Sequence, residues 1–259
     1  MIKFTSLLCV QMLVVQLLFA QPKNRAIVDQ PIQWFALASN IKLSNSLTWM
    51  LEGQFRYASD FDPQQYQART ALDIHLSDHF SVVPIGYVYT WNYLYGKQPA
   101  SFANNEHRIW QQVSYKHSLS KLKVDHRLRL EQRFIESHSV VNNEIIPQGY
   151  TNRQHRLRYR LMIRMPLNRQ AIQAKTIYLS VYDEAFLSWG KSVTFHEPDQ
   201  NRIFVGLGYQ VDKALTLQGG FLYQSLIKSN GTKQENNVGF QFQINYNFDL
   251  TKKSEHVSN

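Results

Sequence analysis

The sequence predicts an all-β fold, a transmembrane antiparallel up-and-down β-barrel, and three observations support this prediction. Apolar and charged residues alternate along many segments, the connections between segments alternate between short and long, and the chain opens with a secretory signal. Successive side chains of a strand point to opposite faces, so a period of two indicates β-strands. An apolar face toward lipid and a polar face toward the lumen are typical of outer-membrane barrels.

The alternation is clearest in the segments 121–136 and 152–165. In the first, the charged residues are separated by mostly apolar ones from Leu122 to Phe134. In the second, arginines alternate with Leu157, Tyr159 and Ile163. A soluble β-sandwich also alternates, but its polar face rarely concentrates so many arginines at successive positions. The pattern therefore favours a barrel with a charged lumen.

The N-terminus is typical of a secretory signal peptide. Lys3 precedes an apolar stretch over 4–19, and Ala20 is a suitable last residue before cleavage. The expected organisation is a signal peptide over 1–20 and a single outer-membrane barrel domain over 21–259. Cys9, the only cysteine, lies inside the signal, so the mature chain is expected to have no disulfide. Localisation in the outer membrane of a Gram-negative bacterium is expected.

The charge of the chain is basic, with a formal net charge of +9. A basic excess can indicate a nucleic-acid partner. Here the arginines are spread along alternating strands of an exported chain, which argues against nucleic acid. After the signal there is no run of ~18 apolar residues that would predict a transmembrane helix. The expected partners are outer-membrane lipid and a small anionic solute.

Eleven segments have the length and pattern of strands. Bacterial single-chain barrels have an even number of strands, so we expect about twelve, with residues 21–31 helping to form the additional strand, or ten if one segment is not a strand. The segments are 32–43, 46–58, 64–76, 79–93, 105–118, 122–136, 152–165, 175–188, 200–212, 214–227 and 235–249.

The connections fall into two length classes, as expected for short periplasmic turns and longer outside loops. Short polar turns are predicted at 44–45, 77–78, 119–120 and 212–213. Longer connections are predicted at 59–63, 94–104, 137–151, 189–199 and 228–234. The segment 166–174 is an exception, because it is long but falls on the side of the short turns.

Five motifs occur in a fixed order: EHR at 106–108, RLRLEQRF at 127–134, RLRY at 156–159, DEAF at 183–186 and NRIFVGLGY at 201–209. As an ordered set they resemble the exported β-barrel family known as domain of unknown function 2490, common in Gram-negative bacteria of the Bacteroidetes group. The resemblance covers essentially the whole mature chain. It implies a barrel fold and an outer-membrane compartment, and it brings no established activity.

The lumen is expected to hold a cluster of charges. In one allowed register Glu131 lies opposite Arg158 and Asp125 opposite Arg164. Arg108 is then expected beside Glu131, and Glu184 is expected to face Arg202. The candidate lumen charge cluster consists of Arg108, Asp125, Arg127, Arg129, Glu131, Arg133, Arg156, Arg158, Arg160, Arg164, Glu184 and Arg202.

Two interpretations of this cluster are open. The charges can form a structural ion-pair network that fills a small barrel, because cross-strand opposite charges stabilise a sheet. Alternatively, the arginines in excess can form a site or path for anions, since the guanidinium fork suits carboxylate and phosphate. The expected function is a non-enzymatic small pore, carrier or structural barrel that favours anionic solutes.

An outer-membrane enzyme acting on lipid or lipopolysaccharide acyl chains is the alternative, and it needs a serine, a histidine and an acid close together. Ser229 superficially fits an outer-membrane phospholipase motif, but Ile227 occupies the position of the histidine, and Asn230-Gly231 predicts a turn. His196-Glu197 lacks a second His or Cys at ligand spacing. We therefore expect no catalytic set, no metal site and no cofactor. A soluble exported β-sandwich is a third possibility.

Overall fold

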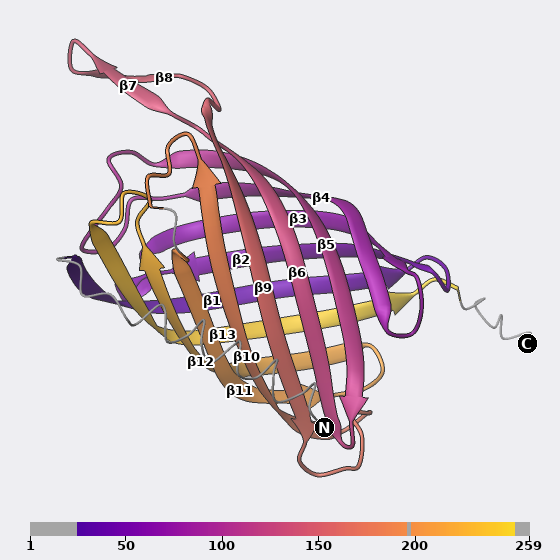
Figure 1. The fold of residues 1–259 in the computed structure, drawn as a ribbon. Helices are drawn as coiled ribbons and strands as arrows, with labels where there is room; N and C mark the ends of the chain where they lie inside the picture. Colours follow the sequence, from indigo (N-terminus) through magenta and orange to yellow (C-terminus); the bar gives the residue numbers. More distant parts are fainter. Residues whose placement is uncertain (1–24, 196–197, 252–259) are drawn as a thin grey trace, which may run out of the picture.

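The computed structural model describes residues 25–195 and 198–251, which form a closed β-barrel (Figure 1). The signal peptide expected over 1–20 lies outside the described residues. Eleven strands form the barrel: β1 (Ala26–Lys42), β2 (Leu47–Tyr57), β3 (Pro63–His75), β4 (Phe80–Asn92), β5 (Asn104–Leu119), β6 (Leu122–Ile135), β9 (Asn152–Pro166), β10 (Thr176–Gly190), β11 (Gln200–Gln210), β12 (Leu215–Ile227) and β13 (Lys233–Asp249).

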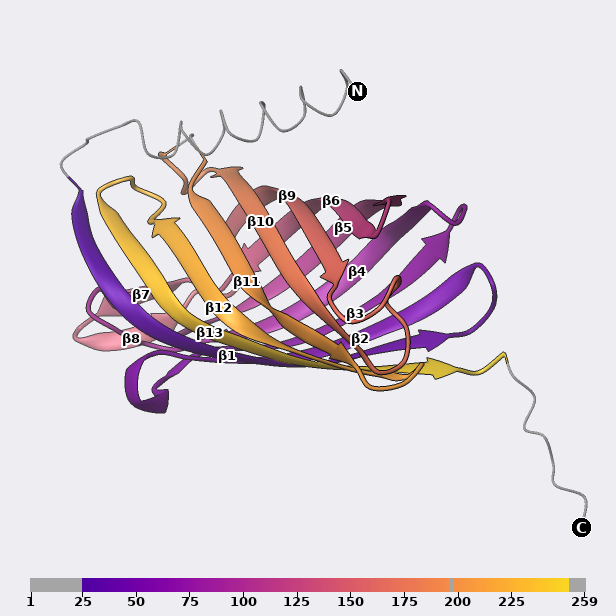
Figure 2. The same cartoon turned by 90° about the horizontal axis from the view of Figure 1, so that it is seen from below.

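All eleven segments that the alternation predicts as strands are strands of the barrel, but the expected count of about twelve is wrong. Residues 26–31 extend β1 instead of forming another strand. The barrel closes by a parallel pairing of β1 with β13, while its other neighbouring strands are antiparallel. A parallel closing pair allows an odd number of strands. Figures 1 and 2 show the two terminal strands side by side.

The connections sort by length to opposite ends of the barrel, as the sequence predicts. One end carries the turns 43–46, 76–79, 120–121 and 211–214 together with the longer 167–175, and the other carries 58–62, 93–103, 136–151, 191–199 and 228–232. We call these the short-turn end and the long-loop end. The 136–151 connection contains its own hairpin of β7 (His138–Val141) and β8 (Glu144–Pro147), which projects beyond the barrel wall (Figure 1). Asn142 and Asn143, both with positive φ, make its tight turn.

The parallel closing pair requires a glycine in β13. Gly239 is the register partner of Ile32, and a Cβ at Gly239 would overlap the Ile32 carbonyl oxygen. We expect Gly239→Ala to lower the free energy of unfolding by about 1–3 kcal/mol, the usual cost of overpacking, measured by urea unfolding of the refolded barrel. Gly53→Ala is the matched control, because its Cβ meets only the Phe55 ring at 3.8 Å. Equal stability of the two variants would contradict this account of the closure.

The exterior of the barrel is apolar. Outward-facing side chains such as Leu128, Val205, Phe221 and Phe240 are each 46–53 % exposed, whereas exposed apolar patches of this extent are rare on soluble monomers. Large aromatic side chains gather near both ends: Trp91 and Tyr93 at the long-loop end, and Trp49, Phe80, Tyr246 and Phe248 at the short-turn end. The soluble β-sandwich is excluded, because the strands form one closed sheet.

The interior holds two apolar clusters on opposite sides. Trp34, Tyr182 and Phe204 belong to the first cluster, with Ile32 and Leu222. The second consists of Ala71, Val83, Val88 and Trp110. Charged side chains are buried alongside these clusters. Within 25–195 and 198–251, no helix is long and apolar enough to span a membrane.

Candidate functional site in the barrel lumen

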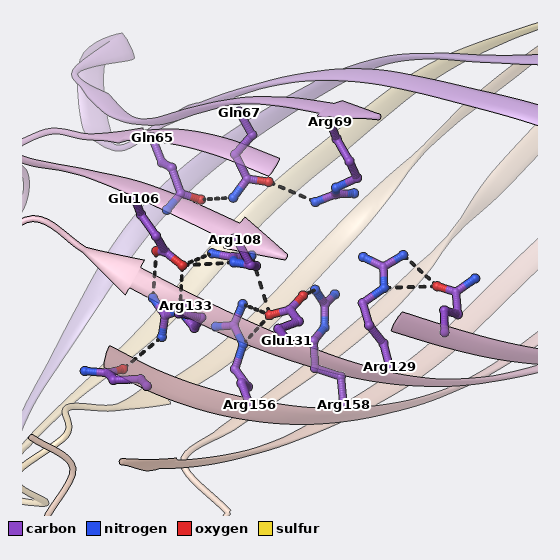
Figure 3. A network of polar contacts seen from close by, with 12 residues as sticks. Gln65, Gln67, Arg69, Glu106, Arg108, Arg129, Glu131, Arg133, Arg156 and Arg158 are labelled. Atoms are coloured by element: carbon purple, nitrogen blue, oxygen red, sulfur yellow. Dashed lines mark hydrogen bonds and ion pairs between the residues drawn. The ribbon is translucent and has the colours of Figure 1, made fainter. Parts of the chain in front are cut away.

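A buried carboxylate, Glu131 of β6, organises one part of the lumen. It is fully buried and forms ion pairs with Arg156 of the neighbouring β9 at 2.6 Å, Arg158 of β9 at 2.6 Å and Arg108 of β5 at 3.6 Å. Figure 3 shows Arg156 and Arg158 converging on this carboxylate. The three side chains meet because alternate residues of adjacent strands share the inner face.

Glu184 of β10 is the second buried carboxylate. It pairs with Arg127 at 2.6 Å, with Arg158 at 2.7 Å and with its register partner Arg202 at 3.3 Å. Arg158 therefore joins Glu131 and Glu184 through its two terminal nitrogens. Arg127 reaches Glu184 across the whole width of β9, which lies between their strands.

Glu106 of β5 extends the network toward the long-loop end. It accepts hydrogen bonds from Arg108 at 2.9 Å and from Arg133 at 2.7 Å (Figure 3). A continuous chain of ion pairs thus runs Arg133–Glu106–Arg108–Glu131–Arg158–Glu184–Arg202. Desolvating such charges is costly, and removing one partner leaves the others buried and uncompensated.

The remaining residues of the candidate cluster have weaker partners. Asp125 lies 3.8 Å from Arg160. Arg129 stacks on the Trp110 ring at 3.9 Å and donates to the Gln112 side-chain oxygen. Arg164 is the register partner of Lys123, and no carboxylate of the described residues lies within ion-pair distance of it. The structure therefore brings eight of the twelve residues into the chain of ion pairs or directly onto it. It leaves Asp125, Arg129, Arg160 and Arg164 to the side.

The register expected between β6 and β9 is wrong by two residues. Glu131 lies opposite Arg156, and Asp125 lies opposite Met162. A shift of two keeps every side chain on its face, so the alternation of residues does not distinguish the two registers. Arg158 still reaches Glu131 diagonally. The pairs Arg108–Glu131 and Glu184–Arg202 do form.

Four further charged residues of the lumen are absent from the cluster predicted from the sequence: Glu52, Arg56, Arg69 and Glu106. Glu106 is fully buried between two arginines, and Arg69 pairs with Glu52 at 2.9 Å. Arg56 stacks on the Trp34 ring at 4.1 Å and donates to the side-chain oxygens of Gln54 and Gln65. The alternation places Glu52 and Arg56 on the polar face of their strand, which is the signal that could have found them.

The lumen widens into a cavity of about 490 Å³ at the long-loop end. The loop 93–103 folds over this outer cavity, where the Tyr95 hydroxyl donates to Glu235 at 2.9 Å and Lys228 pairs with the same carboxylate at 2.6 Å. Burial raises the pKa of Asp199, which lines the cavity from a loop. The cations that line it are Arg56, Arg69, Arg108, Arg133, Arg156, Arg158, Arg202 and Lys228, against the carboxylates Glu106 and Asp199.

Two more cavities follow the lumen toward the short-turn end. A central cavity of about 100 Å³ shares Trp34, Arg56, Arg69, Arg158 and Arg202 with the outer one. A recess of about 810 Å³ opens at the short-turn end and is lined by residues such as Asn40, Lys42 and Asn247. The lumen therefore has a large cavity at each end and a small one between them.

Ser229 lies in a turn, as the sequence predicts. It lies in the connection before β13, where Gly231 has a φ of 72° and Asn230 accepts a hydrogen bond from the Thr232 amide, as in a turn. In the described part of the chain, no three His, Cys, Asp or Glu side chains are grouped to hold a metal ion. His196 and Glu197 lie outside the described residues.

Comparisons with known proteins identify the family. A solved structure of the NanC porin, in a rhombohedral crystal form, is 12 % identical, covers 80 % of this chain and 88 % of its own, and has a TM-score of 0.44. No curated protein matches the chain. The model of the family described as "Protein of unknown function (DUF2490)" matches residues 33–236, most of the chain. This match confirms the resemblance of the ordered motifs, and the chain belongs to that family.

Proposed function

We propose that the chain is a non-enzymatic outer-membrane barrel that admits small anionic solutes in preference to neutral or cationic ones. The observation that carries this proposal is the excess of arginine in the lumen. Seven arginines and one lysine line the outer cavity, against two carboxylates. Pores lined by arginine and lysine favour anions, and a charged cleft with low-dielectric walls raises the local concentration of its counter-ion.

The exterior supports the membrane part of the proposal. Strands of 11–17 residues, as in β2 and β1, are long enough to cross a bilayer when tilted. Their outward faces carry exposed apolar side chains, and large aromatic side chains gather near both ends. Aromatic girdles at the two interfaces flank the apolar band of outer-membrane barrels. The secretory signal expected from the sequence agrees with this location.

The ion pairs alone do not account for the charge of the lumen. A barrel stabilised only by ion pairs needs about as many carboxylates as arginines, because a buried cation without a counter-charge costs free energy. Arg56 lines the outer cavity, and no described carboxylate lies within ion-pair distance of it. Arg156 pairs only with Glu131 among the described carboxylates, and it shares that carboxylate with Arg108 and Arg158. The surplus of cations is explained if anions enter the lumen.

The proposal predicts which solutes cross a membrane that contains the barrel. Proteoliposomes with the refolded mature protein should take up a small monocarboxylate faster than a neutral solute of equal size, and a cationic one slowest. Uptake of radiolabelled solutes measures the three rates, and liposomes without protein give the background. Equal rates for the three solutes would contradict the anion preference. If proteoliposomes with correctly folded protein took up solutes no faster than liposomes without protein, the proposal that solutes pass through the barrel would be contradicted.

A further inference from the structure

The lining of the central cavity of about 100 Å³ carries an excess of positive charge. This cavity lies between the outer cavity and the short-turn end, in the narrow part of the lumen. Only two carboxylates, Glu52 and Glu184, line it. The cations that line it are Arg56, Arg69, Arg127, Arg158, Arg160 and Arg202.

The two carboxylates are already used by some of these arginines. Glu184 pairs with three of them, and Glu52 pairs with Arg69. Arg160 has a single long contact of 3.8 Å with Asp125, a residue outside the lining. Arg56 is bonded to side-chain amides. Even with Asp125 and Glu131 counted from outside the lining, four carboxylates face six arginines.

Several hydrogen-bond donors at this cavity have no acceptor. The Nε atoms of Arg69, Arg127, Arg160 and Arg202 are buried and have no hydrogen-bond partner among the described residues. Arg202 is only 8 % exposed as a whole residue. A buried donor without an acceptor costs free energy. The arginines whose Nε atoms lack acceptors therefore belong to the same lining that is short of negative charge.

The size and the donors define the ligand class. A volume of about 100 Å³ exceeds the ~30 Å³ share of one water in the liquid, so the cavity admits a small polyatomic ion. Guanidinium groups present paired N–H donors that match the oxygens of phosphate and carboxylate. We infer that the central cavity binds a single small inorganic oxyanion, of the phosphate or sulfate type. This inference rests on the proposed anion preference, and it adds a defined binding site to it.

Binding of inorganic phosphate to the refolded barrel tests the inference. Titration calorimetry in detergent, at constant ionic strength set with sodium chloride, should give a saturable isotherm with one phosphate per chain. The melting temperature should rise with phosphate and level off as the site fills, because a ligand of the folded state stabilises it by mass action. Sulfate should compete with phosphate. Equal effects of phosphate and chloride at matched ionic strength would overturn the inference.

Variants locate the site within the lumen. Arg160→Gln removes a lining arginine that has only one long ion pair, so the barrel should fold, and phosphate affinity should fall at least tenfold. Arg56→Gln, at the opposite wall of the cavity, should have a similar effect. Arg164→Gln is the matched control, because Arg164 belongs to the same strand as Arg160 and is absent from the lining. If Arg164→Gln weakened binding as much as Arg160→Gln, the inference would fail.

Binding and passage are measured separately, so the two proposals can fail separately. Anion-selective uptake without saturable phosphate binding overturns the central site and leaves the proposed function standing. If phosphate binds saturably, Arg160→Gln weakens that binding, and no solute is taken up, the central site is supported. The proposal that solutes pass through the barrel is then overturned.

Discussion

Glu131→Gln is expected to lower the free energy of unfolding by about 3–5 kcal/mol, the range for removing one partner of a buried ion pair. The change is nearly isosteric but removes the charge that Arg108, Arg156 and Arg158 share. Glu131 is fully buried, so water does not replace the lost carboxylate. The three guanidinium groups are left to repel one another in a low-dielectric environment. Urea unfolding, followed by heat-modified mobility in gels, measures the effect.

Glu144→Gln is the control for this prediction. Glu144 is exposed on the β7–β8 hairpin, so its neutralisation should change stability by no more than about 0.5 kcal/mol. Replacing Arg156 by Met in the Glu131→Gln background should restore part of the stability, because it removes one of the uncompensated cations. An unfolding midpoint of Glu131→Gln equal to that of the unchanged protein would rule out the buried network as a source of stability.

Arg56→Glu is expected to reduce the permeability ratio of chloride to sodium by at least tenfold. Arg56 lines both the outer and the central cavity. A unit charge about 10 Å from a passing ion contributes roughly 1.7 kcal/mol at an effective dielectric constant of 20. Reversing the sign changes the charge by two units, and about 1.4 kcal/mol already corresponds to a factor of ten. The reversal potential of a planar bilayer under a salt gradient gives the ratio.

Arg164→Glu makes the same charge change outside these cavities and serves as the control. It should change the permeability ratio much less than Arg56→Glu, because Arg164 lines neither the outer nor the central cavity. Arg56→Gln should give an intermediate ratio, since it removes one unit of charge and not two. Indistinguishable ratios for Arg56→Glu and the unchanged protein would show that Arg56 is not on the path of the ions.

The strands are predictable from the sequence because their two faces meet opposite environments. An apolar exterior and a charged interior impose a strict period of two, which all eleven strands follow closely enough to be recognised. The number of strands is less predictable, since it depends on how the ends meet. The parallel pairing of β1 with β13 is a long-range contact that leaves little local signal beyond Gly239. The β7–β8 hairpin has only four residues in each strand, and its adjacent pairs of aliphatic residues show no period of two that would mark it as strands.

The lumen charges are partly predictable for the same reason. Alternation assigns Glu131, Arg158 and Glu184 to the inner face, and the structure joins them. It does not fix the register of β6 on β9, because a shift by two residues preserves the faces. Nor does it show that Arg56 and Arg69, from strands far along the sheet, line the same central cavity as Arg158. These side chains line the same cavity only because the sheet closes into a barrel.

The most direct test of the account is the reversal potential of the unmodified mature protein, refolded and inserted in a planar bilayer under a potassium chloride gradient. The excess of arginine in the lumen predicts a steady conductance whose reversal potential has the sign of chloride selectivity. A cation-selective or unselective conductance would contradict the proposed role of the arginines. Absence of conductance from protein shown to be folded would contradict passage and leave the charged lumen with a structural or binding role.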